Sequence, residues 1–167
     1  MNKSKNLARQ AMIAAVYTVI SLAFAPFAYG AIQVRFSEAL TLLPIFTPDA
    51  IVGVTIGCFI TNMIGSSPID MVFGTLATFI SAVMTYKLRN VMTKGLPIAA
   101  AIPPILVNAV VVGFEITFFF SDIHTLPILL LNMLTVGLGQ VVSCLFIGII
   151  MVKFISSSDK LRELISK

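Results

Sequence analysis

The stretch IQVRFSEALTLLP, residues 32–44, bears on both the fold and the site. Ten of its thirteen residues are apolar or small, yet Arg35 and Glu38 lie inside the run. Only 11% of the whole chain is charged, so two charges in one short apolar segment require an explanation. Ionisable groups are costly in hydrocarbon and commonly mark a functional site, so both residues are candidates for one.

The composition of the chain is typical of a protein in a lipid bilayer. Of its 167 residues, 58% are hydrophobic, and the mean hydropathy is +1.03. A soluble domain carries about 25% charged residues, so this chain could not cover a soluble surface with polar groups. We predict an all-α membrane protein in which residues 1–167 form one integral membrane domain. The first apolar stretch runs about 20 residues from Leu7, which favours a retained span over a cleaved signal peptide.

Proline, glycine and capping residues divide the apolar sequence into six predicted transmembrane helices: 7–27, 37–46, 48–64, 68–86, 97–119 and 126–154. Thr47, Ser67 and Thr125 are the expected N-caps, and Pro103-Pro104 are expected to kink or start the fifth helix. A full span needs about 20 residues, so the second and third helices are short. We expect them to be tilted, re-entrant or buried among neighbours, which is tolerated where protein or a water-filled cavity surrounds them.

Basic residues predict the orientation of the helices. They precede the first helix, connect the fourth to the fifth and follow the sixth: Lys3, Lys5, Arg9, Lys87, Arg89, Lys94, Lys153, Lys160, Arg162 and Lys167. With six spans these clusters fall on one side, so we expect cytoplasmic N and C termini, with residues 1–6 and 156–167 as cytoplasmic ends. Arg35 then falls on the outer side.

Eight polar or ionisable residues are the candidate substrate-binding residues: Arg35, Glu38, Asn62, Asp70, Asn108, Glu115, Asn132 and Gln140. Most fall in the predicted outer half, on different helices but at similar depth. Each is expensive inside a bilayer, so together they predict a pocket open to the outside. No cluster has the spacing of metal ligands, and no metal or cofactor is expected.

Several of these residues have a purely structural alternative. Arg35 and Glu38 are three apart and could pair with each other. Asp70 lies three residues after Ser67, where an acid supports a helix N-terminus. Asn62 and Asn132 could hydrogen-bond neighbouring helices.

The fifth predicted helix carries the least explained charge. Asn108 and Glu115 are seven residues apart and share one face of it. No cation lies near Glu115 in the sequence, so we expect Glu115 to bind ligand or to pair with Arg35. Four phenylalanines surround the outer end of this helix and could face lipid, pack in the core or stack on a flat ring: Phe114, Phe118, Phe119 and Phe120.

Ala11 and Ala15 form an Ala-x-x-x-Ala pair in the predicted first helix. Small residues four apart let another helix approach closely, either within the protein or from a partner. The sequence has no Ser/His/Asp arrangement, no H-E-x-x-H and no Walker A motif, so we expect no enzyme activity. Energy for transport would have to come from a partner or an ion gradient. No internal repeat pairs the two halves, which disfavours a typical secondary transporter.

Three strings resemble one known family: IQVRFSEALTLLPIFTPDAIVGVTIGCFITNMIG, DMVFGTLATFISAVMTY and NAVVVGFE. They are similar to the QueT family, and the likeness covers about residues 11–153, with R-x-S-E-A-L-x-x-L-P as its most specific part. The resemblance implies a substrate-capture subunit (S component) of an energy-coupling factor (ECF) transporter in the bacterial cytoplasmic membrane. It also implies a six-helix bundle with a ligand site near the outer face.

The resemblance implies partners and a ligand as well. The partners would be a transmembrane coupling subunit, contacted by Ala11 and Ala15, and two cytoplasmic ATPases. The ligand would be a queuosine precursor, a 7-substituted deazaguanine or queuine. The chain departs from the family pattern at Gln140, where a glutamate is common. An S component for another vitamin-like molecule and a stand-alone carrier or channel are the alternative functions. A membrane enzyme that uses Glu38 or Glu115 has no supporting motif.

Overall fold

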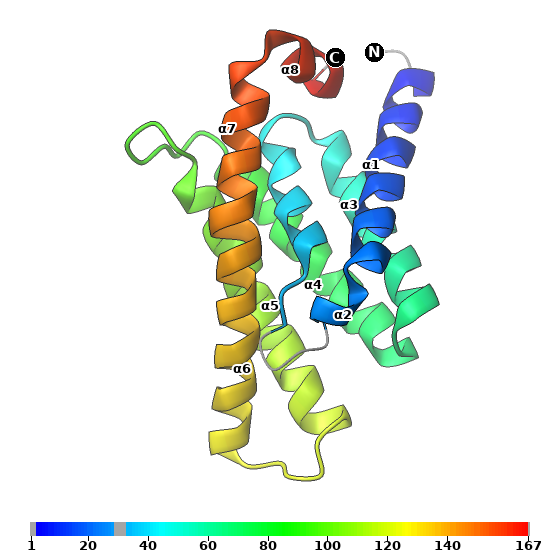
Figure 1. Cartoon of the computed structure of the whole chain (residues 1–167), viewed down its shortest axis with the longest axis vertical. Coiled ribbons are helices and arrows are strands. Elements are labelled where there is room, and N and C mark those ends of the chain that lie inside the picture. The colour runs from blue at the N-terminus through cyan, green and yellow to red at the C-terminus, as the bar shows by residue number, and fades with distance from the viewer. Residues whose placement is uncertain (1–2, 29–32, 167) are drawn as a thin grey trace.

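The computed structural model of the chain describes residues 3–28 and 33–166, and the regular elements of this part are all helices joined by short connections (Figure 1). The elements in chain order are α1 (Lys3–Ala23), α2 (Ala25–Ala28), η1 (Phe36–Ile45), α3 (Asp49–Gly65), α4 (Pro68–Lys87), α5 (Ile98–Phe119), α6 (Leu126–Gln140), η2 (Val141–Gly148), α7 (Ile149–Ser157) and α8 (Asp159–Ser166). The prediction of an all-α protein is confirmed.

Four helical stretches within the described residues are long and apolar enough to cross a membrane: Lys3–Ala23, Pro68–Lys87, Ile98–Phe119 and Leu126–Ser157. The last of these joins α6, η2 and α7 into one continuous rod. The remaining two predicted helices, η1 and α3, are shorter, as the sequence indicates. The count of six transmembrane helices therefore stays a prediction.

Proline explains why the predicted end of the first helix, at residue 27, is wrong. The first helix ends at Ala23, and the separate short helix α2 follows it. Pro26 lacks an N–H and its ring would clash with the carbonyl four residues earlier, so α1 cannot continue through it. In contrast, α5 begins at Ile98 and runs through Pro103 and Pro104, so the proline pair does not start this helix.

Two of the three predicted N-cap residues accept a hydrogen bond from a nearby backbone amide, and the third does not. Ser67 caps α4, because its Oγ accepts the Asp70 amide at 3.0 Å. Thr47 precedes α3, and its hydroxyl accepts the Asp49 amide at 3.4 Å. Thr125 precedes α6, but its side chain makes no capping hydrogen bond.

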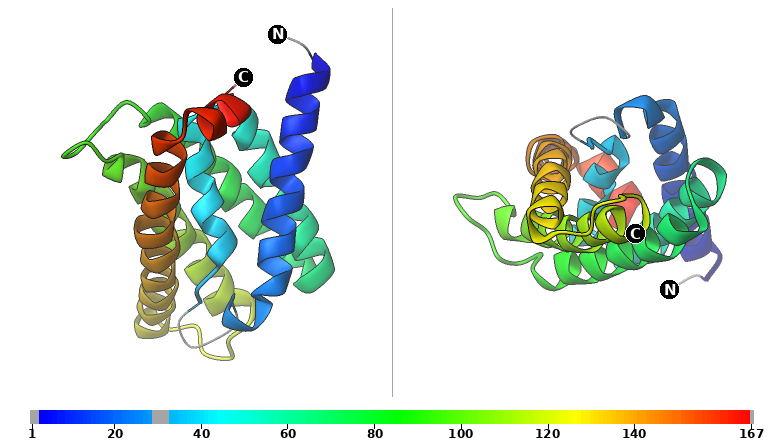
Figure 2. Two further views of the ribbon diagram at one scale, coloured as in Figure 1. Left: turned by 45° about the horizontal axis from the view of Figure 1, so that its top comes forward. Right: turned by 90° about the horizontal axis from the view of Figure 1, so that it is seen from below.

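The helices pack in sequence around a central element. Helix α1 packs on α3, α3 on α4, α4 on α5, and α5 on α6. The short helix η1 lies inside this arrangement, against η2 and α4 (Figure 2). Eight of its ten residues are buried, and these include the polar Ser37, Glu38 and Thr41. Glycines allow the close approaches: a Cβ on Gly57 would lie 2.7 Å from the Tyr17 Cβ.

The central packing joins two unusual helical geometries. Element η1 is a 3-10 helix of ten residues, whereas such runs rarely exceed 3–4 residues. It packs against η2, a π-helix of eight residues in the middle of the last rod. Leu42 of η1 fits against Gly148, where a Cβ would lie 2.7 Å from the leucine Cδ1. Irregular helices of this kind are frequent at functional sites.

The two ends of the bundle differ in chemistry. The start of α1, the α4–α5 connection and α8 lie at one end (Figure 1), and they carry most of the predicted basic clusters. Lys167 lies outside the described residues. At this end Arg9 pairs with Asp49 at 2.9 Å, and both are buried. The sequence did not predict this pair, because Arg9 looked like one more charge of the basic N-terminus.

Candidate functional site

A cavity of about 250 Å³ is lined by elements that lie at the end of the bundle opposite the two termini (Figure 1). It is lined by the linker before η1, the α3–α4 connection, the first turn of α4 and the last turns of α5: Gln33, Arg35, Ser66, Ser67, Asp70, Val112, Glu115, Ile116 and Phe120. Three of the eight candidate residues, Arg35, Asp70 and Glu115, thus line one cavity, and the other five do not. These three come from three separate elements.

Glu115 is the most unusual residue of this cavity. The residue is 1% exposed, and neither carboxylate oxygen has a hydrogen-bond partner among the described residues. Buried polar groups in proteins are nearly always hydrogen-bonded, and an uncompensated buried charge is costly. The carboxylate therefore presents two acceptor oxygens in a cavity wall where a molecule with two donors could satisfy them.

Arg35 pairs with Asp70 beside this carboxylate. The Arg35 guanidinium lies 3.1 Å from one Asp70 oxygen and 3.5 Å from the other. Ser66 also donates to the Asp70 carboxylate, at 2.5 Å. Burial lowers the pKa of Arg35, but the Asp70 carboxylate, with smaller contributions from Cys58, Tyr17 and Glu38, more than offsets this, so the pKa stays above its ordinary value. The expected pairs of Arg35 with Glu38 or Glu115 are therefore wrong, and Asp70 does more than support a helix start.

Glu38 lies in the interior and not in the wall of this cavity. Its carboxylate accepts the Tyr17 hydroxyl at 2.5 Å and the Asn108 amide at 3.4 Å. These bonds tie η1 to α1 and α5, so Glu38 and Asn108 have a complete structural role. A contact of either residue with ligand stays a prediction.

Asn62 and Asn132 join neighbouring helices, as their structural alternative expects. The Asn62 amide donates to the Asp70 carbonyl at 3.0 Å, which ties α3 to α4. The Asn132 amide donates to the Thr117 hydroxyl at 2.9 Å, which ties α6 to α5. Neither residue lines the 250 Å³ cavity.

Gln140 is buried in the last helical rod, away from this cavity. Its side-chain oxygen accepts the Cys144 thiol at 3.3 Å. The preceding Gly139 lies directly against the Gln33 carbonyl, which leaves no room for a Cβ. This end of α6 therefore positions the linker that carries Gln33 and Arg35 into the cavity.

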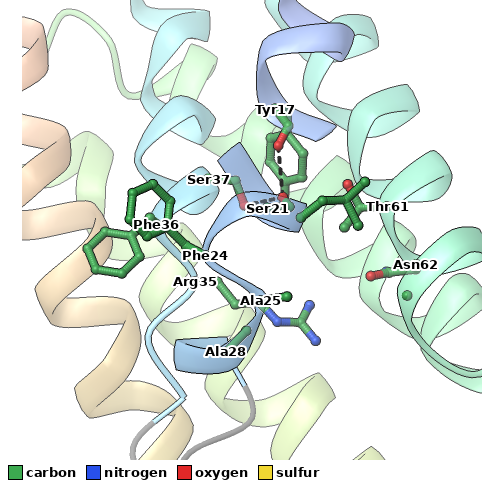
Figure 3. Close-up of a pocket in the computed structure, with 12 residues that line it drawn as sticks. Tyr17, Ser21, Phe24, Ala25, Ala28, Arg35, Phe36, Ser37, Thr61 and Asn62 are labelled. Carbon is green, nitrogen blue, oxygen red and sulfur yellow. Dashed lines mark hydrogen bonds between the residues drawn. The ribbon is translucent and has the colours of Figure 1, made fainter. Parts of the chain in front are cut away.

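Arg35 also borders a second, smaller cavity of about 40 Å³ (Figure 3). This space lies among α1, α2, η1 and α3 and holds at most a few water molecules, since one water needs about 10–15 Å³. Ser21 and Ser37 hydrogen-bond at 2.6 Å in its wall, and the rings of Phe24 and Phe36 lie 4.8 Å apart. The guanidinium thus separates a small inner space from the larger cavity.

Sequence reasoning missed several residues of the site. Gln33 and Ser66 line the larger cavity, and Tyr17 holds Glu38. Gln33 stands two residues before Arg35, and this spacing of polar residues was an available signal. Of the four phenylalanines at the C-terminal end of α5, Phe120 lines the cavity, and all four are partly exposed.

Ala11 and Ala15 lie on an exposed face of α1. The buried face of this helix is formed by Ile13, Ala14 and Tyr17, which pack toward α3. The alternative in which the two alanines pack inside the protein is therefore wrong. A partner helix on this face remains a prediction.

Comparisons with known proteins agree on one family. A family model described as QueT transporter matches residues 7–157. The Queuosine precursor transporter QueT of Lactococcus lactis subsp. cremoris (strain MG1363) is 34% identical over 84 residues, which cover 48% of this chain and 50% of that protein. The chain thus spans about half the length of the curated relative that it matches. No solved structure matches the chain.

Proposed function

The chain belongs to the QueT transporter family, and we propose that it is the substrate-capture subunit of an ATP-driven ECF importer. Its substrate would be a queuosine precursor, a 7-substituted deazaguanine or queuine, taken from outside the cell. The observation that carries this proposal is the buried Glu115 carboxylate, which lines a 250 Å³ cavity and has no hydrogen-bond partner among the described residues.

The chemistry of a deazaguanine suits this carboxylate. Its ring N–H and its exocyclic amine are adjacent donors, and one carboxylate can accept both. The ring carbonyl is an acceptor, for which Arg35 and the Gln33 amide are donors in the same cavity wall. Phe120 offers an aromatic face for the flat ring system. Ligand pockets commonly have volumes of roughly 300–1,000 Å³. This cavity lies just below that range, so it suits a bicyclic base better than a larger ligand.

The distribution of charge supports capture from the outside. Basic residues mark the cytoplasmic side of a membrane protein, and in this chain the described basic residues other than Arg35 lie toward the end that carries both termini. The cavity opens at the other end. We propose that the chain lies in the bacterial cytoplasmic membrane with this cavity outward, and that both termini are cytoplasmic.

The energy for transport would come from partner subunits. The sequence has no Walker A motif, so two cytoplasmic ATPases and a transmembrane coupling subunit would supply it. The exposed Ala11 and Ala15 face of α1 suits the coupling subunit, because small residues allow helix backbones to approach closely.

Ligand binding to the purified chain tests the proposal. Calorimetry with 7-aminomethyl-7-deazaguanine and queuine should show saturable binding, and binding should raise the unfolding temperature. An analogue without the exocyclic amine is the matched control, and it should bind much more weakly because it leaves buried acceptors unpaired. Failure of the whole series to bind would overturn the proposed substrate.

A reconstitution distinguishes the proposed importer from a stand-alone carrier. Liposomes that contain the chain together with the coupling subunit and ATPases should accumulate ligand only with ATP. Liposomes with the chain alone should not. Uptake by the chain alone would overturn the assigned energy source but not the binding site.

A further inference from the structure

A second hollow lies at the opposite end of the protein, between the first turns of α1 and the helix α8. This groove of about 600 Å³ is lined by residues from the two ends of the chain: Lys5, Ala8, Arg9, Met12, Lys160, Glu163 and Leu164. Figure 1 shows α8 and the start of α1 at the same end of the bundle. The groove is separate from the substrate cavity and has no part in the proposed function.

The positive charge available in the groove comes from two lysines. Arg9 is already paired with Asp49 at 2.9 Å and is buried. Lys5 and Lys160 are exposed, and neither is paired with a carboxylate among the described residues. Glu163 is the one acid among the residues of the groove wall. Two ammonium groups from different helices thus face one space at the basic end.

The rest of the groove is apolar and continues along α1. Met12 is 45% exposed and Leu164 is 63% exposed. Beyond the groove, Val16 and Val19 are also exposed on α1. These α1 residues form one stripe on the helix, because they recur every three or four positions: Lys5, Ala8, Met12, Val16 and Val19. From residue 5 to residue 19 this stripe is about 21 Å long, which exceeds one leaflet of a hydrocarbon core of about 30 Å.

We propose that this groove binds an anionic phospholipid of the cytoplasmic leaflet. The lipid phosphate lies between Lys5 and Lys160, and one acyl chain lies along Met12, Val16 and Val19. A basic rim above an apolar stripe matches an amphiphile with a charged head, and basic pockets at this membrane surface suit anionic headgroups. A soluble anion would leave the apolar part of the groove unused.

The lipid stripe and the Ala11–Ala15 face are different faces of α1. At 100° per residue, Ala11 lies about 100° and Ala15 about 60° around the helix from Met12, which is at the centre of the stripe. The two faces therefore adjoin, with Ala11 farther from the stripe than Ala15. The lipid site would stand even if the chain had no coupling subunit.

Native mass spectrometry of the full-length chain with added lipids tests this proposal. Dioleoyl phosphatidylglycerol should bind at least tenfold more tightly than dioleoyl phosphatidylcholine, which has the same acyl chains. Lys5→Gln and Lys160→Gln should each weaken phosphatidylglycerol binding about fivefold, because one lysine near the membrane surface contributes about that factor. Lys153→Gln is the matched control, since Lys153 is exposed on α7 and does not line the groove.

Each outcome decides the proposal. Equal affinity for the two lipids would overturn it. So would a loss of phosphatidylglycerol affinity in Lys153→Gln as large as in the two groove variants, because it would show that any basic residue at this end attracts the lipid. Competition by inorganic phosphate at the same concentration as the lipid would show an anion site and overturn the assignment to a phospholipid. Both lysines are exposed, so the unfolding temperature of each single variant without lipid should match that of the wild type. The two single variants report on the site independently.

Discussion

The Arg35 guanidinium lies 3.1 Å from the Asp70 carboxylate, across 35 residues of sequence. This ion pair fixes the linker before η1 against the first turn of α4, and both side chains line the cavity that contains Glu115. Their side chains are only 17% and 7% exposed. The pair therefore forms a rigid, charged wall beside an acceptor that has no partner of its own among the described residues.

Breaking this pair should destabilise the protein. Arg35→Gln and Asp70→Asn should each lower the free energy of unfolding by about 3 kcal/mol, because each leaves a buried charge uncompensated. The double variant should lose less than the sum of the two. Chemical denaturation in detergent measures all three. The exposed pair Arg162–Asp159 is the control, and Arg162→Gln should change little. Additive losses at Arg35 and Asp70 would contradict a direct interaction.

Tyr17 should matter for stability and not for ligand affinity. Tyr17→Phe removes the hydroxyl that donates to Glu38 at 2.5 Å, and hydrogen bonds to charged groups contribute about 1.5–3 kcal/mol. The free energy of unfolding should fall by that amount, while the dissociation constant of a ligand in the 250 Å³ cavity should stay unchanged. Tyr86→Phe is the matched control, because Tyr86 is in the last turn of α4, where its ring lies under the Arg89 guanidinium. A large loss of affinity in Tyr17→Phe would place the Glu38 network in the ligand site.

Substitution by alanine should destabilise the protein at one glycine of α6 and be tolerated at another. Gly139→Ala would drive a Cβ into the Gln33 carbonyl, and overpacking costs about 1–3 kcal/mol. It should also weaken ligand binding, because it displaces the linker that carries Arg35. A Cβ on Gly137 meets only the Ala109 Cβ, at 3.5 Å, so Gly137→Ala should be tolerated. Equal stability of the two variants would contradict this account of how α6 positions the linker.

Much of the helical framework could be predicted from local sequence. Ser67 before Pro68 marks the start of α4, and the scarcity of charge indicates a membrane protein. The break between α1 and α2 was missed, although Pro26 was visible. The 3-10 geometry of η1 and the π geometry of η2 could not be predicted from local sequence. The two elements are far apart in the chain and pack on each other, with Leu42 against Gly148.

The charged residues of the cavity could be identified from the sequence, but their pairing could not. Because a charge is costly to bury, the amino-acid sequence alone identifies Arg35, Asp70 and Glu115 as candidates. Spacing favours Glu38 as the partner of Arg35, because the two lie on adjacent turns. The partner is in fact Asp70, since the α3–α4 connection brings the start of α4 to the linker. Contacts over 35 residues depend on how helices pack, and no local pattern reports them.

The exposed alanines of α1 should be needed for assembly and not for capture. Ala11→Leu and Ala15→Leu should reduce co-purification with the coupling subunit, because larger side chains prevent close helix contact. Ligand affinity of the isolated chain should stay unchanged. Ala23→Leu is the matched control, as Ala23 is exposed at the far end of the same helix. Normal assembly of both alanine variants would remove this face from the proposed interface.

The most direct measurement is the ligand affinity of Glu115→Gln. Calorimetry with 7-aminomethyl-7-deazaguanine should show at least a tenfold weaker dissociation constant, because an amide cannot accept both donors of the ring edge. The unfolding temperature without ligand should hold or rise, since the change removes a buried charge without a partner among the described residues. Asp122→Asn makes the same chemical change on an exposed loop and should leave affinity unchanged. Unchanged affinity in Glu115→Gln would contradict the assignment of this cavity as the substrate site.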